Sequence, residues 1–214
     1  IPDTFPQEVL DETKGMTVPP LGKRVDLRDI PLVTIDGEDA RDFDDAVWAE
    51  ADTAADNMGG WNIILAIADI AHYVRPGSAL DREAYKRGNS VYFPDRVVPM
   101  LPEALSNDLC SLRPHEPRAC MAAKMRINAS GDLIESTVIR GLMKSAARLT
   151  YNSVQEALDG HPNDLTRPLL APVLQPLYQA YKTLEKARAR RGAVDLDLPE
   201  RKVMLKDGEV QDIS

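Results

Sequence analysis

The chain has 214 residues, a length that allows one large domain or two small ones with a sizeable core. Its hydrophobic content of 43% and charged content of 28% are ordinary for a soluble globular protein, and no apolar run reaches the roughly 18 residues of a membrane span. The net charge of −8 argues against binding nucleic acid through a uniformly basic surface. A nuclease that holds divalent cations must nevertheless concentrate carboxylates, and the bound metal then reverses the local sign of charge.

The cysteines and the N-terminus both indicate a cytoplasmic protein. No basic segment followed by an apolar one opens the sequence, so no secretory signal peptide is expected. Cys110 and Cys120 are ten residues apart and are interpreted as reduced thiols, although a disulfide remains an alternative. Two cysteines and three scattered histidines do not have the spacing of a zinc site.

The first half of the chain alternates short apolar runs with turns. Residues 1–22 carry four prolines and one short helical stretch at 7–14, and we interpret them as a lead-in from an upstream module. Strands are predicted at 32–35, 46–49, 61–70 and 90–93, and the third is apolar enough to be a central strand buried on both faces. A helix is predicted to begin after Ser78, with Asp81 in the capping-box position, and to end at Gly88. Residues 94–112 are expected to be mostly loop with one short turn.

The second half contains two hairpins and two helices. Alternating residues at 121–128, a turn at 130–132 and a strand at 133–140 predict the first hairpin. A short helix at 153–158 is followed by a long amphipathic helix that stops at Gly192. A last hairpin pairs 203–205 with 209–213. The whole pattern predicts an α+β fold with a mixed β-sheet, helices packed on it, and an acidic loop at one edge of the sheet.

The acidic loop is the segment with the strongest chemical signal. Six carboxylates occupy ten residues between two predicted strands: Asp36, Glu38, Asp39, Asp42, Asp44 and Asp45. Neighbouring carboxylates repel one another, and a hard divalent cation relieves that repulsion. Magnesium shares its octahedral shell between a few carboxylates, waters and substrate phosphate, and two such ions can stabilise both oxygens of a phosphodiester displacement.

Two other interpretations of this loop are a solvated turn and a calcium site. A solvated acidic turn is the simpler one, but the apolar flanking residues pull the loop towards a core. A calcium loop of the EF-hand type requires glycine at its sixth position, where Arg41 stands if the loop starts at Asp36. The sequence also lacks a phosphate-binding glycine-rich loop, a nucleophile elbow and an HExxH motif.

Long segments of the chain resemble a known family. The stretch RVDLRDIPLVTIDGEDARDFDDAV is similar to the signature of the ribonuclease II/ribonuclease R family, whose catalytic part is called the RNB domain. AIADIAHYVRPGSALDREAYKRGNSVYFPDRVVPMLPEALSNDLCSL and SAARLTYNSV resemble later segments of that family, and KARARRGAVDLDLPE does so more weakly. The resemblance covers about 23–200 and is strongest to the ribonuclease R branch.

The resemblance implies a hydrolase that degrades single-stranded RNA processively from its 3′ end with Mg²⁺, releasing 5′-nucleoside monophosphates; Mn²⁺ is an alternative ion. We therefore expect RNA as partner, a monomer, and no association with membranes. Residue by residue, the family's four active-site aspartates fall on Asp36, Asp42, Asp44 and Asp45, all candidate metal ligands. Asp44 and Asp42 are the candidate catalytic residues, and Asp44 is expected to be the most critical. Glu38 and Asp39 are outside this set and are interpreted as electrostatic background or helix-capping groups.

Two tyrosines are candidate RNA-binding residues by the same resemblance. Tyr92 falls on the family's aromatic that stacks on bases near the 3′ end, and Tyr151 on a tyrosine near the scissile phosphate. Stacking suits an enzyme without sequence preference, because every base has a π-face. From the residues alone, an ordinary core tyrosine is the favoured interpretation of each; the resemblance favours RNA contact for Tyr92 and leaves the two interpretations of Tyr151 open. The stretch AVDLDLPE, where some members have a second stacking aromatic, has none here; Leu196 or Leu198 lies there instead.

Basic residues and the family's length leave two further questions open. Basic residues gather near the end of the long helix, where they either complement the helix C-terminus or form one wall of an RNA channel: Lys182, Lys186, Arg188, Arg190 and Arg191. Other candidates for phosphate contacts are Arg75, Arg87, Arg113 and Arg118. The family's catalytic domain extends further than the segment matched, so residues 23–214 are expected to be its N-terminal portion. The alternative function is therefore a catalytically incompetent, metal-binding fragment of such an enzyme.

Overall fold

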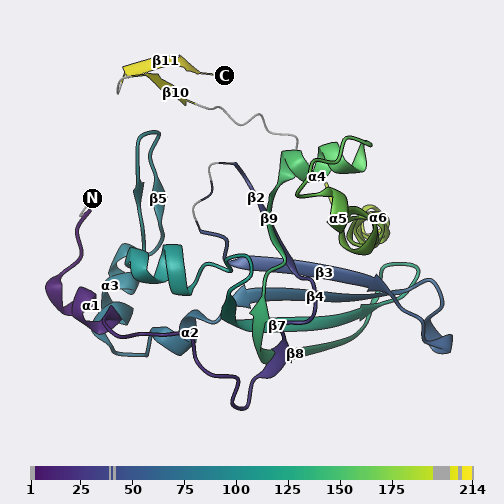
Figure 1. Cartoon of the computed structure of the whole chain (residues 1–214), viewed down its shortest axis with the longest axis horizontal. Coiled ribbons are helices and arrows are strands. Elements are labelled where there is room, and N and C mark those ends of the chain that lie inside the picture. Colours follow the sequence, from purple (N-terminus) through teal and green to yellow (C-terminus); the bar gives the residue numbers. More distant parts are fainter. Residues whose placement is uncertain (1–2, 39, 41, 195–202, 207–208, 214) are drawn as a thin grey trace.

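The computed structural model describes residues 3–38, 40, 42–194, 203–206 and 209–213. Figure 1 shows a curved β-sheet with helices at one end and along one face. The strands are β1 (Val25–Leu27), β2 (Val33–Asp36), β3 (Asp45–Ala51), β4 (Trp61–Ala68), β5 (Val91–Tyr92), β6 (Val97–Val98), β7 (Pro117–Ile127), β8 (Leu133–Lys144), β9 (Ala147–Thr150), β10 (Val203–Lys206) and β11 (Glu209–Ile213). The helices are α1 (Gln7–Thr13), α2 (Ile70–Tyr73), α3 (Ala79–Arg87), α4 (Tyr151–Leu158), α5 (Arg167–Leu169) and α6 (Gln175–Arg190), with single turns η1 (Ala55–Asn57), η2 (Leu105–Leu109) and η3 (Leu170–Leu174).

Seven strands form one mixed sheet in the order β1-β8-β7-β4-β3-β2-β9. The β1–β8 and β2–β9 pairs are parallel, and the other neighbours are antiparallel. β4 lies at the centre and is mostly buried, as its apolar sequence predicts, although Ile67 near its end is exposed. The fold class expected from the sequence, α+β with a mixed sheet and packed helices, is thereby confirmed.

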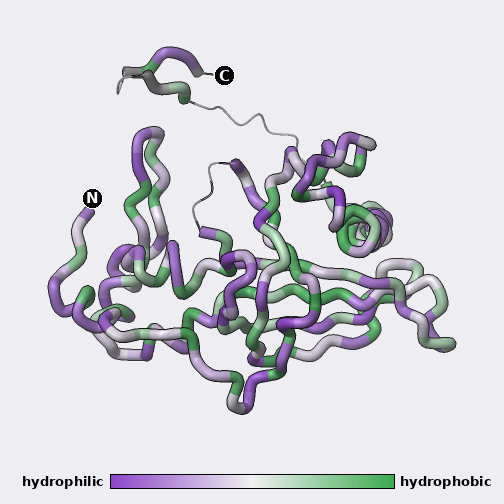
Figure 2. Tube along the Cα trace, viewed as in Figure 1, coloured by the Kyte–Doolittle hydropathy of each residue, from purple (hydrophilic) through white to green (hydrophobic). Residues whose placement is uncertain are grey.

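Three clusters of buried side chains join the helices to this sheet. The largest packs α1, α2 and α3 against one end of the sheet around Leu27, Leu80 and Met143. A second lies under α4 and η3 beside β2 and β9, and a third places Ala180 of α6 on Ala49 of β3. Figure 2 shows hydrophobic residues along the central strands of the sheet.

The β7–β8 hairpin forms as its alternating sequence predicts. The Asn128 side chain accepts hydrogen bonds from the backbone N–H groups of Ser130 and Asp132, which closes the turn. Gly131 has a φ of 80°, and a β-carbon there would lie 2.6 Å from the carbonyl oxygen of Thr183 in α6. A glycine is therefore required both by the backbone conformation and by the close approach of the helix.

Helix α3 begins and ends where the sequence indicates, with one difference in its cap. The Ser78 hydroxyl accepts from the backbone N–H of Asp81, and Gly88 ends the helix with a φ of 79°. The Asp81 carboxylate accepts from the backbone N–H of Gly77 rather than of Ser78, so the reciprocal half of the capping box is displaced by one residue.

The lead-in segment packs on this helix. Val9 of α1 is buried in the main core, and the carboxylate of Glu12 accepts from the backbone N–H groups of Ala79 and Leu80 at 2.8 Å each. Arg87 of α3 donates to the carbonyl of Thr4. Residues 4–16 therefore pack closely on α3 and on the main core; their origin in an upstream RNA-binding module stays a prediction.

Several short elements were not predicted from the sequence: β1, α2, β6, α5 and β9. Each is four residues long or shorter, so periodicity gives almost no signal for it. β6 corrects the expectation that 94–112 is mostly loop, because Val97–Val98 pairs with Val91–Tyr92 to form a hairpin. Among the helices that the structure describes, none is long and apolar enough to cross a bilayer.

Candidate active site

The acidic loop joins two neighbouring strands of the sheet. β2 ends at Asp36 and β3 begins at Asp45, and these strands are the second and third from the β9 end. Parallel pairing aligns Asp36 with Thr150, the last residue of β9. Helix α4 begins immediately afterwards at Tyr151, so the start of the loop and the start of this helix lie side by side.

Phe43 anchors the middle of the loop. Its side chain is only 3% exposed, its backbone N–H donates to the Ser111 hydroxyl at 3.3 Å, and its carbonyl accepts from the backbone N–H of Leu112 at 2.6 Å. The carbonyl of Asp44 accepts from the backbone N–H of Ala68 at 2.8 Å. On either side of buried Phe43, Asp42 is half-buried and Asp44 is solvent-accessible.

The carboxylates lie close enough to affect one another's ionisation. Partial burial raises the pKa of Asp44 above its usual value, and the negative charges of Asp42 and Asp36 raise it further. The pKa of Asp45 is also raised, first by partial burial and then by the charges of Asp44 and Asp36. The four aspartates therefore share one electrostatic site in which a full set of negative charges is unfavourable.

This site fits a hard divalent cation by its chemistry. Carboxylate oxygens are the ligands that Mg²⁺ prefers, and a cation would offset the repulsion that raises these pKa values. In the described part of the chain, no three His, Cys, Asp or Glu side chains converge closely enough to hold a metal by themselves. Magnesium usually completes its shell with waters and substrate phosphate rather than with an all-protein cage.

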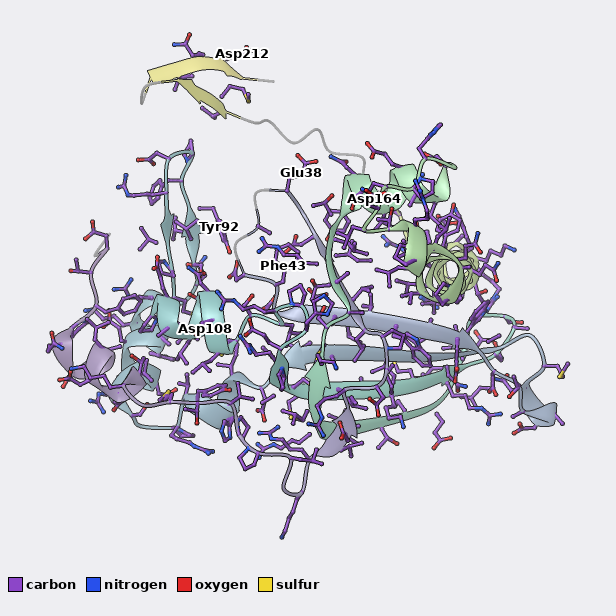
Figure 3. All side chains as sticks on the ribbon, in the orientation of Figure 1. Glu38, Phe43, Tyr92, Asp108, Asp164 and Asp212 are labelled. Carbon is purple, nitrogen blue, oxygen red and sulfur yellow. The ribbon has the colours of Figure 1, made fainter. Side chains whose placement is uncertain are left out.

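Both candidate RNA-binding tyrosines are exposed beside this loop. Tyr92 is 60% exposed on the β5–β6 hairpin, and its hydroxyl donates to the Asp42 carboxylate at 3.3 Å. Figure 3 shows Tyr92 on the side of β5 that faces the loop, with Phe43 at the base of the loop. Tyr151 is 62% exposed as the first residue of α4. The reading of either tyrosine as an ordinary core residue is therefore wrong.

Glu38 and Asp39 were expected to provide background charge or to cap a helix. The Glu38 carboxylate accepts from the Asn152 side chain at 2.9 Å, in the first turn of α4. The cap itself is Thr150, whose hydroxyl accepts from the backbone N–H of Ser153. Glu38 thus tethers the loop to the start of the helix without capping it, while Asp39 lies outside the described residues.

Two of the four arginines suggested for phosphate contacts have structural roles instead. Arg118 is buried and donates to Asp108 and Glu116, and the side chain of Arg87 donates to Glu83 and covers the ring of Phe5. Arg75 and Arg113 are exposed and remain candidates, although Arg113 pairs with Asp108 at 3.2 Å.

In the basic cluster of the long helix, two side chains form local ion pairs. Arg190 pairs with Asp132 at 2.6 Å, and Lys182 pairs with Glu185 at 2.9 Å. These contacts favour a structural role for the two residues over a channel wall. Leu196 and Leu198, where a second stacking aromatic was sought, lie outside the described residues.

Arg148 is a site residue that the sequence did not reveal. It lies on β9 between the buried residues Ala147 and Leu149, so its side chain projects to the opposite face, where the loop lies. Its guanidinium lies 3.8 Å from the centre of the Phe43 ring and donates to the carbonyl of Ala40 at 2.5 Å. The alternation of 147–150 was the available signal, but four residues are too few to predict a strand.

Together these features define an α+β protein whose clustered carboxylates and exposed aromatic rings meet at one loop of a mixed sheet. The family model for the RNB domain matches residues 24–214, and the chain belongs to this family. The chain is similar to ribonuclease R of Vibrio cholerae, with 50% identity over 207 residues, and of Escherichia coli, with 49% over 209. Each alignment covers 94% of this chain and 25% of the relative, so the chain spans about a quarter of their length.

The fold is also similar to that of a solved relative. The structure of Mycoplasma genitalium RNase R in complex with ribose-methylated single-stranded RNA aligns with a TM-score of 0.90 and 26% identity. The alignment covers 99% of this chain and 33% of the solved one. The family resemblance read from the sequence is thereby confirmed.

Proposed function

We propose that this chain is part of a magnesium-dependent exoribonuclease that hydrolyses single-stranded RNA processively from the 3′ end and releases 5′-nucleoside monophosphates. The observation that carries the proposal is the acidic loop, in which partial burial and the charges of Asp36 and its neighbours raise the pKa of Asp44 and Asp45, beside two exposed tyrosines. The relatives named ribonuclease R, and the relative solved with single-stranded RNA, support the same assignment of substrate.

Among the described residues, the aspartates would bind the metal and the tyrosines would contact the RNA. Asp36, Asp42, Asp44 and Asp45 would hold Mg²⁺, which when bound stabilises the attacking and leaving oxygens of a phosphodiester. Tyr92 would stack on a base near the 3′ end and hold any base through its π-face. Tyr151 would lie near the scissile phosphate, because its neighbour Thr150 pairs with Asp36.

The decisive test is Asp44→Asn in a full-length protein that carries this segment. A neutral isostere removes one charge without a large change of shape, so hydrolysis of a labelled single-stranded RNA is expected to fall by orders of magnitude while RNA binding persists. The measurement is a gel assay of RNA decay with Mg²⁺ and with chelator, beside a filter-binding assay. Turnover near that of the wild type would sink the assignment of Asp44, and loss of both activities would indicate a folding defect.

The alternative function is a metal-binding segment without catalytic competence of its own. It predicts that the 214-residue chain binds Mn²⁺ but degrades RNA no faster with Mg²⁺ than with chelator. Addition of the segments that its relatives carry would then restore decay.

A further inference from the structure

We propose that Arg148 is a positioning residue that fixes the acidic loop by holding Ala40 and Phe43 at once. This inference rests on the proposed function for its meaning, since the loop it fixes carries the candidate metal ligands. Arg148 itself would contact neither metal nor RNA; it would act through the backbone and the ring that it touches.

The contacts of Arg148 reach both sides of Asp42 in the sequence. Its guanidinium donates to the carbonyl of Ala40, two residues before Asp42, at 2.5 Å. The same planar group lies over the ring of Phe43, the residue after Asp42, at 3.8 Å from the ring centre. One planar guanidinium group therefore contacts the loop on both sides of Asp42 in the sequence.

The support for Arg148 comes from the sheet rather than from the loop. β9 pairs in parallel with β2, and Arg148 is aligned with Thr34, two residues before the loop begins at Asp36. The residues on either side of Arg148, Ala147 and Leu149, are buried in the cluster under α4. The loop is thereby attached to a strand whose own position is set by packing, which is how a loop acquires a defined geometry.

Arginine suits this role for reasons that lysine does not share. A planar guanidinium can stack on an aromatic face and donate in its own plane at the same time, whereas an ammonium is a compact point charge. On its outer side, Arg148 borders a cavity of about 290 Å³ between the loop and the segment around Ser111. Substitution by a smaller side chain therefore removes the contacts without introducing a clash.

Hydrogen exchange in the 214-residue chain tests the proposal without any metal. The backbone N–H of Phe43 donates to Ser111, and that of Leu112 donates to Phe43, so both amides report on the seating of the loop. In Arg148→Gln these two amides are expected to exchange roughly tenfold faster, while those of β4 keep their protection. Unchanged exchange at Phe43 and Leu112 would overturn the proposal.

Mn²⁺ binding, followed by electron paramagnetic resonance, links the positioning to the metal. Loss of an outer-shell partner commonly weakens metal affinity roughly tenfold to a hundredfold, and Arg148→Gln is expected in that range. Arg148→Lys keeps the charge but not the planar contacts, so it is expected to resemble Arg148→Gln. Wild-type exchange and affinity in Arg148→Lys would show that charge alone matters, and would overturn the positioning role.

Arg167→Gln is the matched control, because its guanidinium also donates to a backbone carbonyl, that of Pro162, away from the loop. It should change neither exchange in the loop nor affinity for Mn²⁺. If the wild-type chain binds no Mn²⁺, the metal site of the proposed function fails. The exchange experiment still decides whether Arg148 fixes the loop.

Discussion

At the scale of single residues, the acidic loop carries more negative charge than its surroundings offset. The pKa of Asp44 is raised above its ordinary value of 3.8, first by partial burial and then by Asp42 and Asp36. The folded chain therefore binds this proton more tightly than the unfolded chain does. Stability due to this group is greatest at low pH and falls as the pH rises from 3.8 through the raised pKa.

The first prediction concerns the loss of stability that the Asp44 charge causes in the metal-free chain. At pH 7 with chelator, Asp44→Asn is expected to unfold at a higher temperature than the wild type, because it removes one repelling charge. The difference should shrink as the pH approaches 3, and it should reverse when Mg²⁺ stabilises the wild type by binding its folded state. Circular dichroism during heating measures it. Asp164→Asn, at an exposed position outside the acidic loop, is the control; a lower melting temperature for Asp44→Asn at pH 7 would contradict the prediction.

The second prediction separates the ring of Tyr92 from its hydroxyl. Tyr92→Ala in a full-length protein is expected to lengthen the shortest RNA product, because the last nucleotides lose a stacking contact worth about 1–3 kcal/mol per base. Tyr92→Phe keeps the ring and loses only the hydrogen bond to Asp42, so its shortest product should match the wild type. Product lengths are measured on a denaturing gel. Equal products from Tyr92→Ala and the wild type would exclude stacking.

At the scale of secondary-structure elements, β1 depends on one buried ion pair. Arg24 directly precedes β1; it donates to Asp69 at 2.7 Å and to the carbonyl of Gly141 in β8 at 3.3 Å. The Asp69 side chain is 0% exposed, and its second oxygen has no hydrogen-bond partner among the residues that the structure describes. Asp69 therefore depends on Arg24 for most of its compensation.

The third prediction is that Arg24→Met destabilises the chain strongly. Removal of one partner of a buried pair leaves an uncompensated charge, which typically costs about 3–5 kcal/mol of unfolding free energy. Urea denaturation measures the change. Arg140→Met is the control, because Arg140 is exposed and lies 3.9 Å from the same carboxylate. The double variant Arg24→Met with Asp69→Leu should recover most of the loss; equal stability of Arg24→Met and the wild type would show that Asp69 has other support.

The elements with strong periodicity or clear end signals could be predicted from the sequence. The β7–β8 hairpin, α3 with Ser78 and Gly88, and the long helix α6 appear within a few residues of their expected bounds. β9 could not be predicted, because a four-residue strand becomes stable only through its parallel partner β2. The candidate site likewise contains residues that the sequence could predict and one that it could not. The aspartates were visible as a motif, but the contact of Arg148 with Phe43 joins residues 105 positions apart and has no local signal.

At the scale of the whole molecule, the chain spans about a quarter of the length of its curated relatives. It carries the acidic loop and both tyrosines, and its net charge is −8. Such a charge weakens the attraction of RNA unless cationic groups or bound metal offset it.

The fourth prediction is that the 214-residue chain degrades RNA far more slowly, and less processively, than a chain extended to the length of its relatives. Additional segments can supply positioned cationic donors, which commonly change rates of phosphoryl transfer by orders of magnitude. The two proteins are compared at equal concentration on one labelled single-stranded RNA. Equal rates and equal processivity would show that this segment is a self-sufficient nuclease.

The parallel pairing of β2 with β9 also bears on the order of folding. Strands β3, β4, β7 and β8 are joined as successive antiparallel neighbours, whereas β9 must return to β2 across more than a hundred residues. Contacts between distant segments carry a larger entropic cost of loop closure, so we expect β9, and β1 on its similarly distant partner β8, to dock last. Pulse-labelled hydrogen exchange during refolding should then protect β4 before Phe43. A chain in which only the central hairpins had formed would contain every aspartate of the loop, but these aspartates would not yet lie close together. Affinity for metal would therefore arise only at the final step of folding.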